Sequence, residues 1–497
     1  MDNDFILVLD LGGPQAVEMA RKLRNQCYYT EIMSRGADEA LFRRKAPRGI
    51  LVVGEDDCNE PFPGAALALD VPVLALGGAA RRMIETFGAV SEGVLLKEQA
   101  SQITFQGADL PQPCPLFDQL SESDRYFTRV DGFALPEGFV SIASTMEGYS
   151  PAFANFERRL YGLQFYAESN DPDGAVILSN FAEKICGCTP IWTAKDFLEE
   201  EVRYIRERVG EGSALMAVSG GVDSTTCALL MRRAIGERVT CVFIDTGLMR
   251  SGEAEQVRNT FEGELGLPLI CVDAGERMLN RLRGVVDPVE KRQVIYEEYM
   301  KIFAEVGREH PEAEYFVEGT IYSDLLARGS SDAVYARRFD PGKRLEPIRM
   351  LFKDEVRILS ELLGMPRSLS ARQPFPGPGL AVRCLGEVTE SKLALLRRAD
   401  AIFREQIQLA GQDKRLTRYF VLLDDARTLG RRLGVTTREY ACVLRAVSEQ
   451  GLASYTVGKL PYDLLERVAA RIIREIPGIN RVVYDISPCD NTFVEWQ

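Results

Sequence analysis

The sequence predicts an α/β protein of three domains, and three observations lead to this prediction. The chain has 497 residues, which is too long for one core and suggests about three domains. Up to residue 383, short apolar runs alternate with helical patterns, as in mostly parallel sheets. Beyond residue 383 this alternation is lost, which favours a smaller α+β domain at the end of the chain.

The first predicted domain covers residues 1–182. Its strands are short apolar runs that end in turn residues, and helical patterns lie between several of them. The predicted strands are 5–10, 49–53, 71–76 and 139–143, and two of the predicted helices are 15–25 and 79–87. A linker is predicted at 183–195.

The second predicted domain covers residues 196–383 and the third covers 384–497. The second begins with a helix, a strand, a glycine loop, a helix and a strand, at 196–209, 214–218, 219–222, 224–235 and 239–244. It ends in a Pro/Gly-rich segment at 366–383, which predicts an ordered loop and a boundary. The third combines helices at 391–408 and 462–475 with apolar runs at 419–423 and 481–486.

Composition excludes several classes of function. The 60 basic and 73 acidic residues give a net charge of −13, which argues against a general nucleic-acid or membrane-surface binder. Hydropathy and the N-terminal sequence predict no membrane span and no signal peptide. Eleven scattered cysteines without a C-x-x-C motif, together with the single histidine His310, argue against a zinc site and favour reduced thiols in a cytoplasm.

The most specific motif is AVSGGVDST at 217–225, between a predicted strand and a predicted helix. Its glycines let the backbone approach an anion, and the following helix offers free N–H groups and the positive end of its dipole. The hydroxyls of Ser224 and Thr225 add donors, and Asp223 can orient the loop or bind a metal. A bare glycine turn can be purely structural, but the flanking serine and Asp-Ser-Thr favour a phosphate site. It is not a Walker loop, because no lysine follows the glycines.

The next strand ends at Asp245 and Gly247, at the edge of a parallel sheet where ligand crevices form. The S-G-G-x-D-S/T form resembles the pyrophosphate loop of N-type ATP pyrophosphatases (adenine nucleotide α-hydrolase-like domains). Further motifs in order along the chain resemble those of the GMP synthetase family. They are E-K-R (290–292), G-T-I-Y (319–322), E-P-x-R-x-L-F-K-D-E-V-R (346–357), P-F-P-G-P-G-L-A-V-R (374–383), L-R-R-A-D-A-I-F (396–403), L-R-A-V (444–447) and P-G-I-N-R-V-V-Y-D-I (477–486).

The resemblance implies an ATP-dependent reaction in which the oxygen of XMP attacks the α-phosphorus of ATP with Mg²⁺, and ammonia then displaces AMP. The residues expected to cradle the pyrophosphate are Ser219, Gly220, Gly221, Asp223, Ser224 and Thr225. Asp245 and Gly247 belong to the nucleotide end, and Asp223 and Asp245 are the candidate metal ligands. Asp223 and Lys353 are the candidate catalytic residues, although a helix-surface position explains Lys353 equally well.

The first domain resembles class I glutamine amidotransferases, which need a nucleophilic cysteine, a histidine base and a glutamate that orients it. Gly77 stands in place of the cysteine and Tyr166 in place of the histidine, while Glu168 remains. Glu55 lies where the oxyanion turn is expected, and no histidine precedes position 310. The sequence therefore predicts a degenerate glutaminase. Nitrogen would come from free ammonia, from a separate glutaminase, or not at all.

The expected acceptor site departs from the family pattern. Segment 331–343 lacks the paired histidines of the family, and Cys489 stands at the lysine position of the C-terminal tail. The candidate acceptor residues are Arg337, Arg338, Arg383 and Glu495. Three interpretations stay open: amination of XMP or a related oxo-purine, adenylation of a different oxo-heterocycle or carboxylate, and a non-catalytic nucleotide-binding role. In the family the C-terminal domain makes a dimer, so a homodimer is expected.

Overall fold

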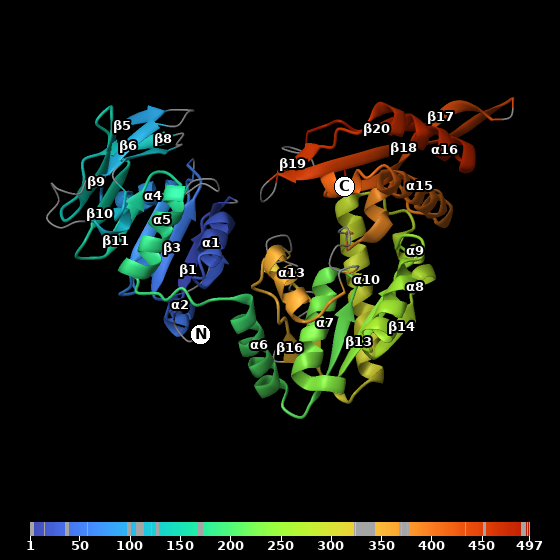
Figure 1. Ribbon diagram of the computed structural model, residues 1–497, viewed down its shortest axis with the longest axis horizontal. Helices are drawn as coiled ribbons and strands as arrows, with labels where there is room; N and C mark the ends of the chain where they lie inside the picture. Colours follow the sequence, from blue (N-terminus) through green and yellow to red (C-terminus); the bar gives the residue numbers. More distant parts are fainter. Residues whose placement is uncertain are drawn as a thin grey trace. The chain divides into compact units, whose positions relative to one another are not determined.

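The structure is a computed structural model (Figure 1), in which the chain folds into two compact units, Met1–Phe197 and Leu198–Gln497. The residues that it describes are 4–13, 15–34, 39–56, 58–96, 101–105, 114–120, 122–125, 129–166, 172–322, 324, 343–366, 369, 375, 377–432, 434–450, 454–488, 494 and 496. The predicted α/β class with parallel sheets is confirmed, but among the described sheets only the five-stranded sheet of the second unit is parallel throughout. The predicted boundary at 383 lies inside the second unit.

The first unit is built on a nine-stranded sheet with the order β2-β1-β3-β4-β11-β10-β9-β6-β7. The five strands from β2 to β11 are parallel, and β10, β9, β6 and β7 continue the sheet with antiparallel pairs. In order across the sheet, the strands are Thr30–Ser34, Ile6–Asp10, Gly49–Gly54, Val73–Gly77, Leu160–Leu163, Ala152–Asn155, Val140–Thr145, Ser101–Phe105 and Glu122–Arg125. Strands β5 (Ser91–Leu96) and β8 (Arg129–Phe133) form a separate antiparallel pair.

The helices of the first unit connect these strands and cover the sheet. They are α1 (Gln15–Asn25), α2 (Glu39–Lys45), α3 (Gly64–Leu67), α4 (Gly78–Thr86) and α5 (Pro172–Asn180), with a 3₁₀ turn at Pro115–Phe117. Strands β1, β3 and β4 are almost wholly buried. Unbroken apolar runs of this kind are typical of parallel strands covered on both faces.

The predicted linker at 183–195 is anchored on the first unit. It starts in a π-helical turn at Phe181–Ile185. The ring of Trp192 stacks on Tyr29, with centroids 6.2 Å apart. Cys186 and Cys188 are buried, and burial raises the pKa of the Cys188 thiol to about 12. The two cysteines therefore contribute to the packing of the linker against the first unit.

The second unit contains a parallel sheet with the order β14-β13-β12-β15-β16. Its strands, from β12 to β16, are Ser213–Val218, Val239–Asp245, Leu269–Asp273, Ala313–Glu318 and Arg344–Leu345. Its helices are α6 (Ala194–Val209), α7 (Val222–Ile235), α8 (Glu253–Arg258), α9 (Gly275–Leu282), α10 (Pro288–Glu309) and α13 (Lys353–Leu362). Short 3₁₀ or π turns follow α7 and α8, at Gly236–Arg238 and Asn259–Glu264.

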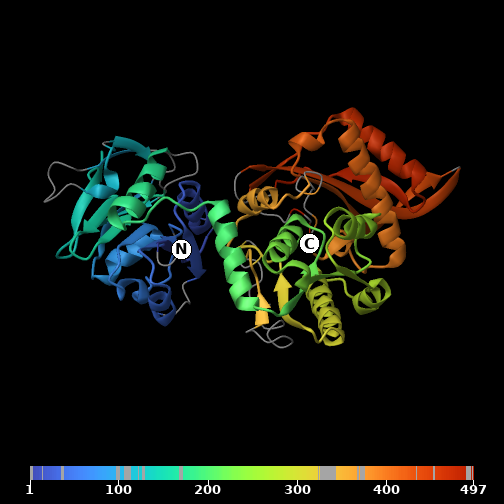
Figure 2. The same cartoon turned by 60° about the horizontal axis from the view of Figure 1, so that its bottom comes forward.

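The C-terminal part of the second unit has its own sheet, in which β18 pairs with β17, β19 and β20. These strands are β17 (Arg418–Arg432), β18 (Val435–Gln450), β19 (Ser454–Val457) and β20 (Ile479–Tyr484), packed with α15 (Glu390–Leu409) and α16 (Tyr462–Glu475). Two 3₁₀ turns, Gly379–Arg383 and Asp413–Arg415, flank α15. Figures 1 and 2 both show the distal end of the β17–β18 hairpin extending beyond α15 and α16.

One core joins this C-terminal sheet to the parallel sheet of the same unit. Leu248 after β13 and Met278 of α9 belong to the same buried cluster as Leu396 of α15 and Leu444 of β18. Burial of such a continuous apolar surface is the main driving force for holding the two parts together. Within the described residues, none of the helices combines the length and the apolar character that a membrane crossing needs.

Candidate functional site

The predicted phosphate loop connects β12 to α7 at the centre of the parallel sheet. From β12 the chain adds β13 and β14 on one side, then crosses to β15 on the other. The strand order therefore reverses beside β12, and ligands of open α/β sheets bind outside the carboxyl ends of strands at such a point. The fold thus places Ser219–Thr225 at the carboxyl edge of the parallel sheet.

Glycines fix the course of this loop. Gly220 has φ +74°, and a methyl group there would lie 2.2 Å from Cγ2 of Val257. Gly221 is extended and forms the N-cap of α7. The backbone can therefore pass close to α8 and turn its N–H groups and the α7 dipole toward the crevice.

Hydroxyl groups stabilise the same loop. Ser219 Oγ lies 3.1 Å from Ser224 Oγ and accepts a hydrogen bond from the N–H of Gly221 at 3.3 Å. Thr225 is buried, and its hydroxyl donates to the carbonyl of Gly221 at 2.8 Å. Ser219 and Ser224 therefore lie within the anion-binding turn, whereas Thr225 acts on its backbone.

Asp223 and Lys353 form an ion pair at the carboxyl edge of the sheet. Lys353, the first residue of α13, contacts Oδ2 of Asp223 through its ammonium group. The other oxygen, Oδ1, is buried and has no hydrogen-bond partner among the described residues. Lys353 therefore lies beside the predicted phosphate loop, with 39% of its side chain exposed.

The free oxygen of Asp223 fits a hard divalent cation such as Mg²⁺, which is typically held by one or two carboxylates and by substrate phosphates. Asp245 ends the neighbouring strand β13, and its Oδ1 accepts the N–H of Gly247 at 2.9 Å. Gly247 has φ +69°, and a methyl group there would lie 2.8 Å from Cα of Gly275. No cluster of three or more His, Cys, Asp or Glu side chains suited to a metal occurs among the described residues. A cation held by Asp223 and Asp245 would need further ligands, such as phosphate oxygens and waters.

The structure places one of the four predicted acceptor residues, Arg383. It is 1% exposed, and its guanidinium lies 4.1 Å from the ring centroid of Phe420 and 5.3 Å from that of Phe375. Such burial between aromatic rings gives it a packing role in this state of the protein. Arg337, Arg338 and Glu495 lie outside the described residues.

The C-terminal tail is fixed at two described points. Val494 is buried beside Phe420, and the indole N–H of Trp496 donates to Oδ2 of Asp485 at 2.6 Å. The same carboxylate oxygen lies 2.6 Å from the buried guanidinium of Arg445. The tail therefore ends against the C-terminal sheet.

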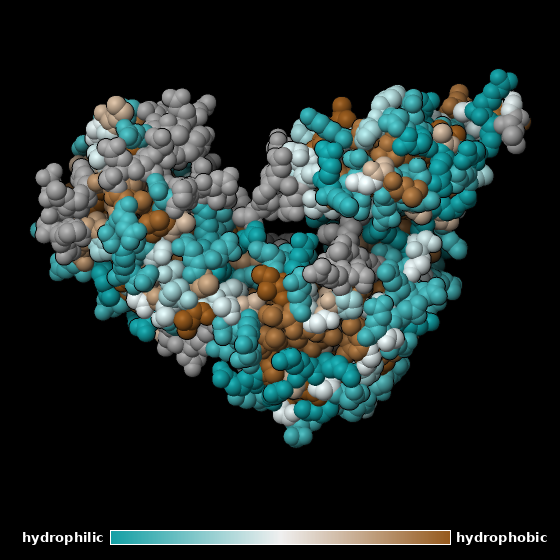
Figure 3. All heavy atoms as spheres, in the orientation of Figure 1, coloured by the Kyte–Doolittle hydropathy of each residue, from teal (hydrophilic) through white to brown (hydrophobic). Residues whose placement is uncertain are grey.

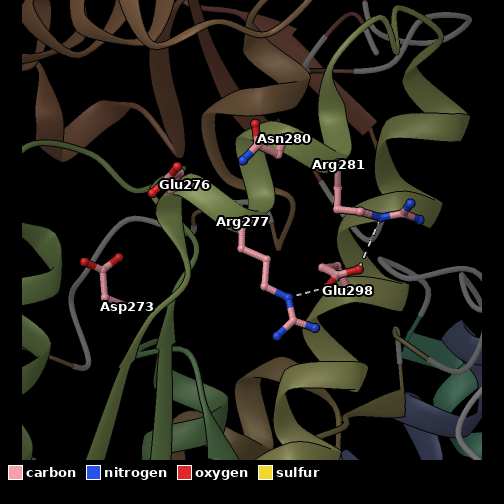
Figure 4. Close-up of a pocket in the computed structure, with 6 residues that line it drawn as sticks. All are labelled: Asp273, Glu276, Arg277, Asn280, Arg281 and Glu298. Atoms are coloured by element: carbon pink, nitrogen blue, oxygen red, sulfur yellow. Dashed lines mark hydrogen bonds and ion pairs between the residues drawn. The ribbon is translucent and has the colours of Figure 1, made fainter.

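A separate hollow of about 620 Å³ lies between α9 and α10 (Figure 4). It is lined by Asp273, Glu276, Arg277, Asn280, Arg281 and Glu298. Arg277 and Arg281 both point to Glu298, at 2.6 and 3.2 Å. Burial alone would raise the pKa of Glu298, but hydrogen bonds from Arg277 and Lys301 outweigh this effect and lower it. Both arginines are thus paired with Glu298, and none of the predicted site residues lines the hollow.

The first unit contains a second strand-to-helix turn, at the end of β4. Gly77 has φ 60° and ψ −132°, a conformation that only glycine adopts without strain. A methyl group on Gly77 would lie 2.1 Å from Oη of Tyr166, which donates to the carbonyl of Gly54 at 2.5 Å. Burial and the nearby carboxylate of Asp56 hold the pKa of Tyr166 well above its usual value. The tyrosine therefore fills the space in which a side chain at position 77 would project. Glu168 lies outside the described residues.

Two long-range contacts join motifs of the second unit that lie far apart in the sequence. Arg397 of α15 donates to the carbonyl of Met249, and Lys291 of α10 donates to that of Cys384. Both belong to motifs noted only as family landmarks. Neither has a local pattern that reveals its partner, because the contacts join segments about 90 to 150 residues apart.

Comparisons with known proteins cover the whole chain. The family model described as GMP synthase C terminal domain matches residues 405–496. The chain is 37% identical over 521 residues to a GMP synthase [glutamine-hydrolyzing] of Acetivibrio thermocellus, with 100% of both chains covered. It is 39% identical over 514 residues to that of Thermomicrobium roseum, with 99% of this chain and 97% of the relative covered. A solved structure described as that of a GMP synthase subunit from Thermoplasma acidophilum covers 37% of this chain and 93% of its own, at 21% identity and a TM-score of 0.31.

The geometry of the β4 turn predicts the effect of adding one methyl group. Gly77→Ala should destabilise the protein by about 2–4 kcal/mol, because strain and the clash with Tyr166 add. Gly88→Ala is the matched control: Gly88 has φ +90° but nothing within 4 Å of an added methyl. Urea unfolding followed by circular dichroism would compare the two. Gly77→Ala/Tyr166→Ala should lose less stability than the sum of its single variants. Equal losses for Gly77→Ala and Gly88→Ala would show that Tyr166 does not fill the position.

Proposed function

The chain belongs to the GMP synthase family, and we propose that it is an ATP-dependent ligase that adenylates an oxo-purine, XMP or a close relative, and aminates it with ammonia without hydrolysing glutamine itself. The intact phosphate loop, with Lys353 held against Asp223, carries the proposal for ATP. In this proposal the first unit is a class I amidotransferase-like domain, the parallel sheet of the second unit is an ATP pyrophosphatase domain, and residues 384–497 are a dimerisation domain.

The loop residues would act by positioning and by electrostatics. The backbone of Ser219–Gly221 and the first turn of α7 would cradle the pyrophosphate end of ATP. Asp223 and Asp245 would hold Mg²⁺, which when bound neutralises phosphate charge. In this proposal Lys353 exchanges Asp223 for a phosphate oxygen, so that its cation meets the charge that develops as pyrophosphate leaves.

The first unit supports the absence of glutamine hydrolysis. Its turn retains the geometry of a nucleophile elbow, but Gly77 supplies no nucleophile and Tyr166 occupies the adjoining space. No histidine precedes position 310, so a cysteine of this unit would have no imidazole base. Triad members act as a unit, and loss of nucleophile and base together removes the chemistry. The nitrogen would then come from free ammonia or from a separate glutaminase.

A second candidate function follows from the altered acceptor segments. Cys489 and the sequence 331–343 replace positively charged or paired-histidine family positions, while the ATP loop is intact. A relative that adenylates a different oxo-heterocycle or carboxylate fits these changes. A purely structural role fits less well, because a scaffold that binds no nucleotide has no need of the complete pyrophosphate loop.

Pyrophosphate release from ATP tests the proposed function. With Mg²⁺ and ammonium present, XMP or another oxo-purine should raise the rate well above that of ATP alone. Glutamine should not replace ammonium, and no glutamate should form from it. Release that depends only on a non-purine acceptor would support the second function. Glutamate formation by a homogeneous preparation would contradict the proposed loss of glutaminase activity.

Two substitutions test the nucleotide site. Asp223→Ala, which removes a proposed cation ligand, and Ser219→Ala, which removes a hydroxyl of the loop, should each weaken the binding of ATP–Mg²⁺. For Ser219→Ala the expected loss is about 10- to 100-fold, since a hydrogen bond to a charged group contributes roughly 1.5–3 kcal/mol. Ser213→Ala, at the opposite end of β12, is the matched control and should bind normally. Titration calorimetry measures the affinities. Unchanged affinity in both loop variants would mean that the loop is only structural.

A homodimer is proposed through the C-terminal sheet. Ile486 is 75% exposed and Val483 is 44% exposed, and Figure 3 shows hydrophobic residues among hydrophilic ones along the β17–β18 region. The apolar face of α16 is not available for this purpose: Leu464, Val468 and Ile472 are buried in the core of their own chain. The contribution of α16 would therefore be limited to its exposed start at Tyr462.

Light scattering tests the dimer. The protein should have twice the mass of one chain, and Val483→Asp/Ile486→Asp should halve it, because charges do not fit an apolar interface. Val90→Asp, which alters an exposed valine of the first unit, should leave the mass unchanged. A monomeric wild-type protein would contradict the proposal.

XMP, titrated in parallel, should bind weakly, and tight binding would show that Arg337, Arg338 or another cation replaces the lost lysine.

A further inference from the structure

The loop that follows β13 is held by a helix from the C-terminal part of the same unit. Arg397 of α15 donates from Nε to the carbonyl of Met249 at 2.9 Å and from Nη2 to the carbonyl of Gly247. A planar guanidinium can bridge two carbonyls in a fixed geometry. This one side chain therefore fixes two peptide groups of the loop.

Further contacts attach the same loop to the same part of the chain. The N–H of Leu380 donates to the carbonyl of Leu248 at 2.8 Å. Arg250 lies 3.2 Å from the carboxylate of Asp400, and its guanidinium lies 4.4 Å from the ring centroid of Phe375. Every residue from 247 to 250 thus has a contact with the segment 375–400. The conformation of the loop is set from outside the parallel sheet.

The loop carries groups of the proposed nucleotide site. Asp245 Oδ1 accepts the N–H of Gly247, and the carbonyl of that glycine accepts from Arg397. Burial lowers the pKa of Arg397, and the negative charge of Asp245 opposes this effect. The orientation of the Asp245 carboxylate depends on Gly247, and Gly247 is held by Arg397.

We infer that Arg397 is a positioning residue for nucleotide binding, which holds the Asp245–Arg250 loop in the conformation that receives ATP and its cation. The inference rests on the proposed function and assigns to α15 a part in the ATP site. Arg397 would act through the loop and not by contact with the reacting atoms. Its loss should therefore raise the KM for ATP more than it lowers kcat at saturating ATP.

Three variants of the full-length chain test this role. Arg397→Gln removes the charge and the forked geometry, and Arg397→Lys keeps the charge but cannot bridge two carbonyls in the same way. Arg398→Gln is the matched control, because Arg398 is the next residue of α15, is exposed and bonds the carbonyl of Glu475. The probe is a non-hydrolysable ATP analogue with Mg²⁺, and hydrogen exchange of the 245–250 backbone is measured without nucleotide.

Arg397→Gln should lower the affinity for the analogue at least tenfold and speed hydrogen exchange of the loop. Arg397→Lys should have an affinity and an exchange rate between those of Arg397→Gln and the wild type. Arg398→Gln should stay within twofold of the wild type in both quantities. If Arg397→Gln does not fold, the decision rests on Arg397→Lys. The inference would be overturned if Arg397→Gln had the same loop exchange rate and the same affinity for the analogue as Arg398→Gln. If the wild type does not bind the analogue, the proposed function fails, and the exchange data alone decide whether Arg397 holds the loop.

Discussion

Both units depend on one backbone feature: a buried parallel strand turns directly into a helix through a glycine with positive φ. Gly77 is this glycine between β4 and α4, with φ 60°, and Gly220 is its counterpart between β12 and α7, with φ +74°. The turn places the next backbone groups and the helix dipole at the carboxyl edge of the sheet. Each unit therefore has a candidate binding site at the carboxyl edge of its sheet. The side chains that surround the turn decide what that site can bind or catalyse.

The two turns differ in what surrounds them. Around Gly220 stand hydroxyls, a carboxylate with one free oxygen, and a lysine. Around Gly77 stand a tyrosine hydroxyl bonded to the carbonyl of Gly54 and the acidic residues Glu55 and Asp56. A reactive side chain at such a turn stores strain of about 1–3 kcal/mol. Glycine removes that strain, and the tyrosine fills the space. If the turn has lost catalysis, as proposed, the same change would also gain stability.

Local patterns explain how much could be predicted from the sequence. The strand, glycine loop and helix around Ser219 were predicted because each signal lies within a dozen residues, and the structure places them at the carboxyl edge of the sheet. For the hairpin of β17 and β18 the sequence indicated only an apolar run at 419–423. The distal half of the hairpin is exposed and carries charges and glycines in place of an apolar pattern. Arg397 was missed because its partners, Gly247 and Met249, are about 150 residues away.

The same long-range contacts set the conformation of the loop that follows β13. The groups that hold residues 247–250 come from Phe375, Leu380, Arg397 and Asp400. Leu248 also packs in the core shared with α15 and β18. A change in α15 therefore reaches the loop directly, although α15 and the loop are about 150 residues apart in the sequence.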